Sequence, residues 1–127
     1  MVVTNKAPIL VVEDNEANMK FLLFILKRLG LSYEKAYSGE EAMEIIKDQE
    51  FSCMLFDINL GDGISGLELM EIVRKIDKYK DTPIIAVTAY FGENFETEIL
   101  AKGFTDYLGK PYVIDQLKSK LDKYHIL

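Results

Sequence analysis

The chain is poor in cysteine and in positive charge, and it has no long apolar run. Its one cysteine, Cys53, excludes an internal disulfide, which is typical of a protein kept in a reducing compartment. No stretch approaches the roughly 18 apolar residues needed to cross a bilayer, and the N-terminus lacks the apolar core of a signal peptide. We therefore expect a cytoplasmic protein without membrane insertion.

Positive charge is too sparse for a protein that binds nucleic acid directly. The net charge is −6, with 15 Lys and Arg against 21 Asp and Glu. Phosphate backbones are held by clustered Lys and Arg, whereas the lysines of this chain alternate with acids along predicted helices. The composition therefore argues against nucleic acid as a direct partner.

Proline and glycine are also too few, and too scattered, to form a linker. The three prolines and eight glycines are spread among periodic segments, and no repeat or low-complexity tract is visible. The length of 127 residues is that of one ordinary domain, and 49% hydrophobic residues are enough for a folded core. We predict a single domain over residues 1–127, with its core from about 7 to 124.

Short apolar runs alternate with longer amphipathic segments along the chain. Apolar runs that end in charge indicate strands, and Ser, Asn or Gly at a segment boundary indicates a helix cap. Two Ser-x-x-Glu sequences, 38–41 and 65–68, predict capping boxes. The predicted strands are 9–12, 32–37, 51–56, 84–87 and 106–108. The predicted helices are 16–29, 39 to about 49, 66 to about 76, about 94–102 and 113–123.

This alternation predicts an α/β fold, a parallel sheet with right-handed crossovers and helices on both faces. In an open sheet of this kind the carboxyl ends of the strands share one edge, and ligands bind outside it. Polar residues follow four of the strands: Glu13 and Asp14, Asp57, Thr88 and Lys110. We expect one site that contains three carboxylates, a hydroxyl and an ammonium group.

Asp57 is the candidate phosphoacceptor of this site. A carboxylate fixed at the end of a central strand can act as a covalent nucleophile and form an aspartyl phosphate. Taken alone, a strand-end Asp is more often a helix cap or a turn residue. Glu13 and Asp14 favour the phosphoacceptor over the cap or turn residue, because three neighbouring carboxylates repel one another unless a cation is present.

Mg²⁺ suits these carboxylates, because it takes oxygen ligands and usually binds one or two carboxylates together with phosphate oxygens and water. We predict Asp14 and Asp57 as direct ligands and the backbone carbonyl of Asn59 as a third protein ligand. Glu13 is expected to act through water. Mn²⁺ is the expected substitute for Mg²⁺.

Lys110 and Thr88 complete the predicted site. Phosphoryl transfer requires mainly positioning and charge stabilisation, which a mobile ammonium and a hydroxyl donor supply. Neither residue is diagnostic alone, since a strand-end Lys is usually a solvated charge. Pro111 leaves open whether the peptide bond before it is cis.

Together, the order and spacing of these residues resemble the receiver domain of two-component response regulators, over about residues 7–124. The segments that carry the resemblance are Val11–Asn15, Asp57–Asn59, Thr88–Ala89 and Asp106–Pro111. The resemblance implies a doubly wound, flavodoxin-like (βα)5 domain with strand order 2-1-3-4-5. It also implies that Asp57 accepts a phosphoryl group from phosphohistidine with Mg²⁺, so that the protein is a phosphoacceptor rather than a turnover enzyme.

The resemblance further implies a switch. Thr88 moves toward the phosphoryl group, Tyr107 turns inward behind it, and the surface of the fourth helix, fifth strand and fifth helix changes its partner preference. The implied partners are a histidine kinase or a histidine phosphotransfer protein, and a downstream protein that the sequence does not name. The expected oligomeric state is a monomer or a weak, phosphorylation-dependent dimer.

Three features depart from the usual pattern of the family. The acidic pair is Glu13-Asp14, where Asp-Asp is frequent. The loop after Asp57 lacks a common proline and is one residue longer. Tyr90 is bulky, and positions 59 and 90 flank the path by which water would attack an acyl phosphate. We predict that Asn59 and Tyr90 tune the lifetime of the phosphoryl group, and that Tyr90 slows self-dephosphorylation.

Several alternatives remain. The protein is either a free-standing receiver, which the initial Met and the lack of a linker favour, or a receiver of a hybrid histidine kinase, which Asn15 and Asn18 favour. A phosphatase of the haloacid dehalogenase kind uses similar residues, but its acidic pair comes last and a second Asp stands where this chain has Asn59. A receiver-like scaffold that never meets phosphate would usually lack one member of the site.

The first predicted helix contains six consecutive apolar residues, Phe21–Leu26, which point all round the helix axis. One buried face cannot hold all six. We expect the last helix to cover the excess, in preference to a surface on which a partner docks.

Overall fold

Short strands alternate with helices along the whole of the part of the chain that the structure describes, residues 7–89, 92 and 94–127 of a computed structural model. Within these residues, five parallel strands form one sheet of order β2-β1-β3-β4-β5, as predicted. The strands are β1 (Ile9–Val12), β2 (Tyr33–Ala36), β3 (Cys53–Phe56), β4 (Ile84–Thr88) and β5 (Asp106–Gly109). The helices are α1 (Glu16–Arg28), α2 (Gly39–Ile45), α3 (Gly66–Arg74), the 3-10 helix η1 (Asp77–Tyr79), α4 (Phe95–Lys102) and α5 (Ile114–Lys123).

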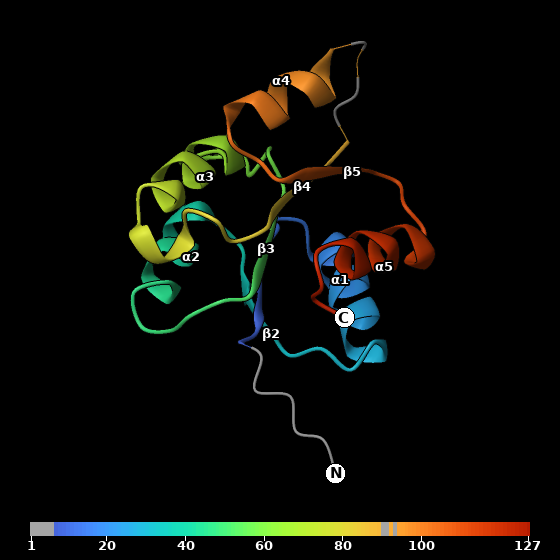
Figure 1. The fold of residues 1–127 in the computed structure, drawn as a ribbon. Helices are drawn as coiled ribbons and strands as arrows, with labels where there is room; N and C mark the ends of the chain where they lie inside the picture. Colours follow the sequence, from blue (N-terminus) through green and yellow to red (C-terminus); the bar gives the residue numbers. More distant parts are fainter. Residues whose placement is uncertain (1–6, 90–91, 93) are drawn as a thin grey trace.

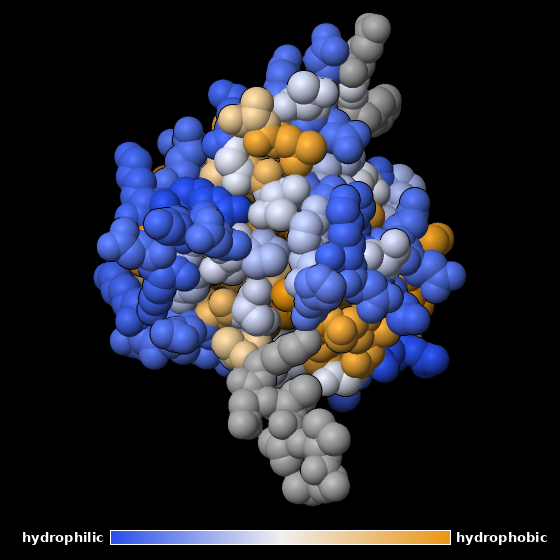
Figure 2. Space-filling model, in the orientation of Figure 1, coloured by the Kyte–Doolittle hydropathy of each residue, from blue (hydrophilic) through white to orange (hydrophobic). Residues whose placement is uncertain are grey.

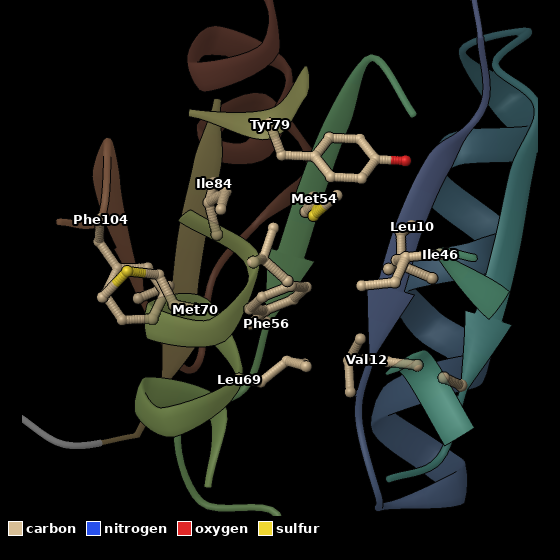
Figure 3. Packing of buried hydrophobic residues seen from close by; sticks show 14 of the residues in the cluster. Leu10, Val12, Ile46, Met54, Phe56, Leu69, Met70, Tyr79, Ile84 and Phe104 are labelled. Carbon is tan, nitrogen blue, oxygen red and sulfur yellow. The ribbon is translucent and has the colours of Figure 1, made fainter. Parts of the chain in front are cut away.

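Helices cover both faces of the sheet. Figure 1 shows α1 and α5 side by side on one face, with α2 and α3 on the other. Successive side chains of a strand point to opposite faces, so Leu10 and Val12 enter the core beneath α2, α3 and α4, while Ile9 and Val11 enter the core beneath α1 and α5. Figure 3 shows Leu10, Val12 and Phe56 in the first of these cores. Burial on both faces explains why the central strands are continuously apolar.

The register of the strands brings their carboxyl ends to one edge. Val12 of β1 pairs with Phe56 of β3, and Thr88 of β4 pairs with Gly109 of β5. The residues that end or directly follow these strands therefore meet there, as the sequence predicts. They are Glu13, Asp57, Thr88 and Lys110.

The predicted end of α2 and the predicted start of β3 are each wrong by two or more residues. α2 ends at Ile45, not near residue 49, because the buried Ile46 forms its C-cap and the Asp48 N–H donates to the Ile45 carbonyl in a tight turn. β3 begins at Cys53, although the prediction starts at Phe51. Phe51 is buried in the core before the strand pairing begins, so its apolar character reflects packing and not the sheet.

The two predicted capping boxes differ in the structure. At α3, Ser65 Oγ accepts from the Glu68 N–H at 3.1 Å and Glu68 Oε1 accepts from the Ser65 N–H at 3.0 Å, which completes the box. At α2, Ser38 Oγ accepts from the Glu41 N–H at 3.1 Å. The described contacts of α2 contain only this half of the predicted box.

Two phenylalanines of α1 remain exposed. Leu22, Ile25 and Leu26 are buried against α5, but Phe21 is 41% exposed and Phe24 is 52% exposed. The expectation that the last helix covers the whole apolar run is therefore wrong for these two residues. Among the described helices, none is long and apolar enough to span a membrane.

Most of the face drawn in Figure 2 is hydrophilic, with an apolar patch close to the C-terminus. A cavity of about 420 Å³ near this end is lined by Ile9, Leu29, Leu31 and Ile126, among others. Ile9 begins β1, and Leu29 and Leu31 lie between α1 and the start of β2, so the cavity is at the amino ends of these strands. The cavity is therefore remote from the polar edge that the predicted site occupies.

Candidate functional site

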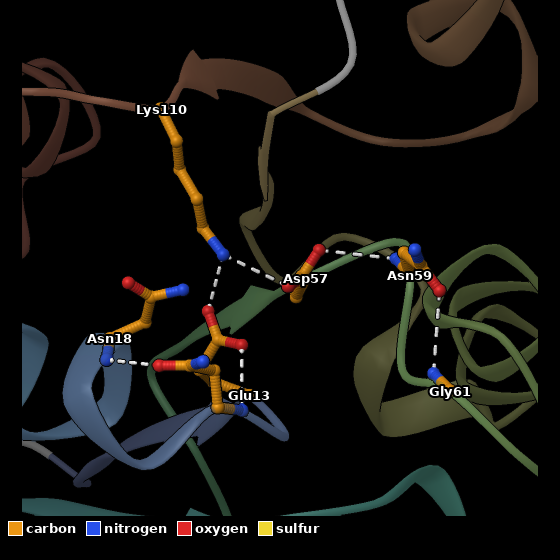
Figure 4. A network of polar contacts seen from close by, with 7 residues as sticks. Glu13, Asn18, Asp57, Asn59, Gly61 and Lys110 are labelled. Carbon is orange, nitrogen blue, oxygen red and sulfur yellow. Dashed lines mark hydrogen bonds and ion pairs between the residues drawn. The ribbon is translucent and has the colours of Figure 1, made fainter.

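Lys110 lies between two buried carboxylates at the carboxyl edge of the sheet. Its Nζ donates to Glu13 Oε1 at 2.5 Å and to Asp57 Oδ2 at 2.9 Å, as Figure 4 shows. Glu13 is 1% exposed and Asp57 is 8% exposed. Buried carboxylates need a partner of opposite charge, and Lys110 supplies it. The peptide bond between Lys110 and Pro111 is cis.

Backbone N–H groups hold the other oxygens of the same two carboxylates. The Asn15 N–H donates to Glu13 Oε2 at 3.2 Å, and the Asn59 N–H donates to Asp57 Oδ1 at 3.1 Å. Each donor is two residues after its acceptor, which is the local pattern that turns at strand ends allow. The four oxygens of Glu13 and Asp57 therefore all have partners, and both side chains are fixed in place.

Burial dominates the electrostatics of this cluster. Burial raises the pKa of Glu13 to about 7. The hydrogen bond from Lys110 lowers this pKa, and the charge of Asp57 raises it further. Burial alone would lower the pKa of Lys110, but hydrogen bonds to Glu13 and Asp57 outweigh it, and the pKa is raised. Lys110 is therefore a firmly charged ammonium group facing a surplus of carboxylates.

Asp14 is the exposed member of the acidic cluster. One carboxylate oxygen each from Glu13, Asp14 and Asp57 can be chosen so that all three lie within 4.8 Å of one another. This set consists of oxygen donors alone, which suits a hard divalent cation better than zinc or another metal that prefers nitrogen or sulfur. The three carboxylates of the predicted metal site are thus brought together, with Asp14 on the solvent side.

The cluster opens into a cavity of about 380 Å³. Its lining includes every strand-end residue of the predicted site, namely Glu13, Asp14, Asp57, Thr88 and Lys110, together with Asn59. Thr88 itself is buried at the end of β4. The cavity also touches Asn18, which was not predicted as a site residue. Asn18 lies three residues after the N-cap Asn15, and its N–H donates to Asn15 Oδ1 at 2.9 Å. Its position in the first turn of α1, directly after β1, is the feature of the sequence that indicates a place beside the site.

Tyr107, predicted as part of the switch, is not among the residues that line this cavity. Tyr107 is half-buried on β5, where its ring meets Phe95 edge-on with 6.0 Å between ring centroids, and it lines a separate groove beside Glu96 and Asp115. The prediction that Tyr107 lies behind the phosphoryl group describes another state and is untested. Tyr90 lies outside the described residues.

A second, more apolar cavity of about 330 Å³ adjoins the first. It shares Asn18, Ala89 and Lys110 with the polar cavity and adds the rings of Phe21 and Tyr112, whose centroids are 5.4 Å apart. An apolar surface therefore begins directly beside the Lys110 side of the carboxylate cluster.

This arrangement has a counterpart among known proteins. A sequence model of the response regulator receiver domain matches residues 9–122. The chain belongs to the receiver domain family. The matched region contains the five described strands and the residues from Glu13 to Lys110, so the site lies entirely within it.

Over the aligned region, individual relatives are about 30% identical to this receiver domain. The histidine kinase BarA of Escherichia coli is 32% identical over 116 residues, which cover 91% of this chain but only 12% of BarA. The response regulator DivK of Brucella anthropi is 29% identical over 116 residues and is covered to 94%. The chain thus corresponds to a small part of one relative and to nearly all of the other.

Solved receiver structures share the fold. The chemotaxis protein CheY4 of Vibrio cholerae superimposes with a TM-score of 0.86 at 28% identity, covering 94% of this chain and 98% of CheY4. The receiver domain of the sensor histidine kinase PA1611 from Pseudomonas aeruginosa gives a TM-score of 0.83 at 28% identity, covering 94% and 97%. That receiver domain has a magnesium ion coordinated in its active-site cleft.

Proposed function

We propose that this receiver domain is a phosphoacceptor switch in which Asp57 takes a phosphoryl group from a phosphohistidine. The observation that carries the proposal is the geometry at Asp57. Its carboxylate is fixed by Lys110 and Asn59 and lines a cavity that also contains Asp14 and Thr88. Preorganised charge of this kind is what phosphoryl transfer requires.

In the proposed step, a carboxylate oxygen of Asp57 attacks the phosphorus atom and the phosphorus–nitrogen bond of the donor breaks, leaving its electron pair on the imidazole. The product is an acyl phosphate on Asp57. Lys110 stabilises the transferring oxygens through its charge, and it does not remove a proton. Thr88, at the end of the neighbouring strand, donates its hydroxyl to one of these oxygens.

We assign the acidic cluster to Mg²⁺, with Mn²⁺ as a substitute. Asp14, Asp57 and the backbone carbonyl of Asn59 would hold the ion, and Glu13 would act through water. When bound, the ion neutralises the carboxylates and the negative charge of the phosphoryl group. The magnesium ion in the cleft of the PA1611 receiver domain supports this choice.

Phosphorylation is proposed to bias a bistable pair, Thr88 and Tyr107. The new dianion attracts the Thr88 hydroxyl, and Tyr107 then leaves its groove beside Phe95 for the space behind Thr88. Because Tyr107 lies on β5 between α4 and α5, its movement would alter the surface that a downstream partner reads.

The donor is proposed to be a protein, either a histidine kinase or a histidine phosphotransfer protein. The apolar cavity beside Lys110 and the exposed rings of Phe21 and Phe24 support a macromolecular donor, because a small phosphodonor would not need them. Both contexts among the relatives fit: a small response regulator such as DivK, or one module of a longer kinase such as BarA. A monomer, or a dimer that forms on phosphorylation, fits either context.

We do not propose turnover of phosphate esters. Position 59, two residues after the phosphoacceptor, is Asn, and an amide cannot act as a general acid. The receiver domain is proposed to catalyse only its own phosphorylation and its slow dephosphorylation, with Asn59 and Tyr90 tuning the second step. A Tyr90→Ala variant should shorten the half-life of the phosphoryl group, and an unchanged half-life would contradict this role.

The proposal is tested by intact-mass measurement after incubation with Mg²⁺ and acetyl phosphate. The parent should gain one phosphoryl mass, and the Asp57→Asn variant should gain none. A parent that gains no mass from acetyl phosphate or from another small phosphodonor, or a variant that gains as much as the parent, would overturn the proposal. Omission of Mg²⁺ in a parallel sample tests the metal assignment.

A further inference from the structure

The loop between β3 and α3, residues 58–65, returns directly beneath the phosphoacceptor. The Gly66 N–H donates to the Ile58 carbonyl at 2.8 Å. A Cβ atom at Gly66 would lie 1.9 Å from the carbonyl oxygen of Asp57, so only glycine allows the chain to come this close. The two ends of the loop are therefore held together beside Asp57, the residue that follows β3.

A side chain from α2 also holds the loop, two residues before α3 begins. Glu40 Oε2 accepts from the Ile64 N–H at 3.0 Å. A Cβ atom at Gly63, whose φ is +87°, would lie 2.7 Å from both carboxylate oxygens of Glu40. A Cβ atom at Gly39 would lie 2.4 Å from Ile64 Cγ1. The residues around this contact are thus shaped to let the Glu40 carboxylate rest against the loop backbone.

The middle of the same loop borders the acidic cluster. The Gly61 N–H makes a long contact of 3.4 Å with Asn59 Oδ1, which Figure 4 shows. Gly61 has a φ of +74°, and a Cβ atom there would lie 3.3 Å from Asp14 Oδ2. The segment from Asn59 to Ile64 therefore connects the Glu40 contact to two of the proposed metal ligands, Asn59 and Asp14.

We propose that Glu40 is a positioning residue for the metal site. Its carboxylate fixes the loop at Ile64, and the fixed loop keeps the Asn59 carbonyl and the Gly61 backbone in place beside Asp14. This inference rests on the proposed Mg²⁺ site. The loop has two glycines in the left-handed region, so it loses much conformational entropy when it is ordered. A hydrogen bond to a charged acceptor is among the stronger ways to offset that loss.

Glu41 provides a matched control, because it is an exposed acid in the same turn of α2. A long-range effect of charge on the metal site, or on the end of α2, would be similar for Glu40 and Glu41. Only Glu40 contacts Ile64. Glu40→Gln keeps an oxygen acceptor and removes the charge, so it separates the effect of the hydrogen bond on Mg²⁺ affinity from the effect of the charge.

The test compares the parent with Glu40→Ala, Glu40→Gln and Glu41→Ala in the full chain. Mg²⁺ affinity is measured by calorimetry, and exchange of the Ile64 amide hydrogen is measured by NMR in the metal-free protein. Removal of a group that orients metal ligands typically costs about tenfold or more in affinity, and we expect about tenfold weaker binding for Glu40→Ala. Glu40→Gln should recover most of that loss, and Glu41→Ala should bind like the parent. Ile64 exchange should accelerate in Glu40→Ala alone.

Equal losses in Glu40→Ala and Glu41→Ala would overturn the proposal, because charge alone would then account for them. Faster Ile64 exchange in Glu40→Ala with unchanged Mg²⁺ affinity would also overturn it, since the loop would be released without consequence for the site. Both outcomes leave phosphorylation of Asp57 intact. Failure of the parent itself to bind Mg²⁺ or to gain a phosphoryl group would instead reject the proposed function together with this inference.

Discussion

Lys110 Nζ bonds to Asp57 Oδ2 at 2.9 Å, and the same ammonium group bonds to Glu13 Oε1 at 2.5 Å. One side chain therefore pairs with two carboxylates of the proposed metal site. In the proposed function Lys110 and the metal ion both stabilise the phosphoryl group, and before phosphorylation we expect them to compete for the same carboxylates.

We therefore predict that Lys110→Met binds Mg²⁺ more tightly than the parent. Loss of one nearby positive charge should strengthen binding by about tenfold at a partly solvated site, and calorimetry at constant ionic strength measures it. Lys120→Met is the matched control, because Lys120 pairs with Asp106 at 2.8 Å at the other end of β5. Weaker Mg²⁺ binding by Lys110→Met would show that the ammonium group organises the carboxylates and does not compete.

We expect Glu13 to make the proposed metal site sensitive to pH near neutrality. Burial raises the pKa of its carboxyl to about 7, so the group holds a proton below that pH in the metal-free protein. Cation binding favours the ionised form, and we predict that Mg²⁺ affinity rises as the pH increases through 7 and levels off above it. Glu13→Gln should flatten this profile. An equally steep rise in the variant would assign the titration to another group.

The same group affects stability with the opposite sign. The folded protein binds the Glu13 proton more tightly than the unfolded chain, whose pKa is near the ordinary 4.5. Its contribution is complete below pH 4.5 and is lost as the pH rises to about 7. Urea unfolding of the metal-free parent and of Glu13→Gln across this range, compared with each other, isolates this contribution from that of the other acids.

The sequence was sufficient to predict the fold and the polar edge because both depend on local pattern. Buried parallel strands are apolar throughout, and each run ends at the residue where the chain reaches the ligand-binding edge. Glu13, Asp57, Thr88 and Lys110 could thus be located without knowing a single distance. The alternation of strands and helices then specified a parallel sheet, and with it the meeting of these residues.

Contacts made by long side chains across the fold were not predictable in this way. The hydrogen bond between Glu40 and Ile64 leaves no periodic pattern in the sequence, and neither do the hydrogen bonds of Arg74 described below. Each of these side chains joins a helix to a loop that is distant in sequence. The exposure of Phe21 and Phe24 was also missed. An apolar run shows how much surface could be buried, but not whether a neighbouring helix is wide enough to cover it.

Arg74 is the clearest example of such a contact. Its guanidinium donates to backbone carbonyls of Tyr79 at 2.9 Å, Thr82 at 2.6 Å and Gly103 at 3.0 Å, and to Thr105 Oγ1 at 2.9 Å. One side chain thus ties the end of α3 to the turn before β4 and to the loop between α4 and β5.

We predict that Arg74→Lys lowers the free energy of unfolding by about 2 kcal/mol, because one ammonium group cannot reach all the oxygens that the planar guanidinium spans, and partly buried acceptors left unpaired are costly. Urea unfolding monitored by circular dichroism measures the change. Arg28→Lys, an exposed arginine over the Phe24 ring at 5.7 Å, should change stability by less than about 0.5 kcal/mol. Equal effects of the two substitutions would mean that the Arg74 contacts contribute little.

The Tyr107 ring packs along β5 over Gly109, which has no side chain to obstruct it. The two residues point to the same face of the strand, and a Cβ atom at position 109 would lie 3.3 Å from Tyr107 Oη and 3.4 Å from Cε1. A methyl group there would crowd the ring in its present groove. If Tyr107 has a second, inward position, Gly109→Ala should favour it without any phosphoryl group.

Fluorotyrosine NMR can follow this ring, with Tyr107→Phe identifying its signal among the seven tyrosines. We predict that the Tyr107 signal of unphosphorylated Gly109→Ala shifts part of the way toward its position in the phosphorylated parent. Ser119→Ala, on the other wall of the same groove, should leave the signal where it is. An unmoved signal in Gly109→Ala would mean that the ring accommodates the methyl group by a small adjustment, and that Gly109 does not influence the switch.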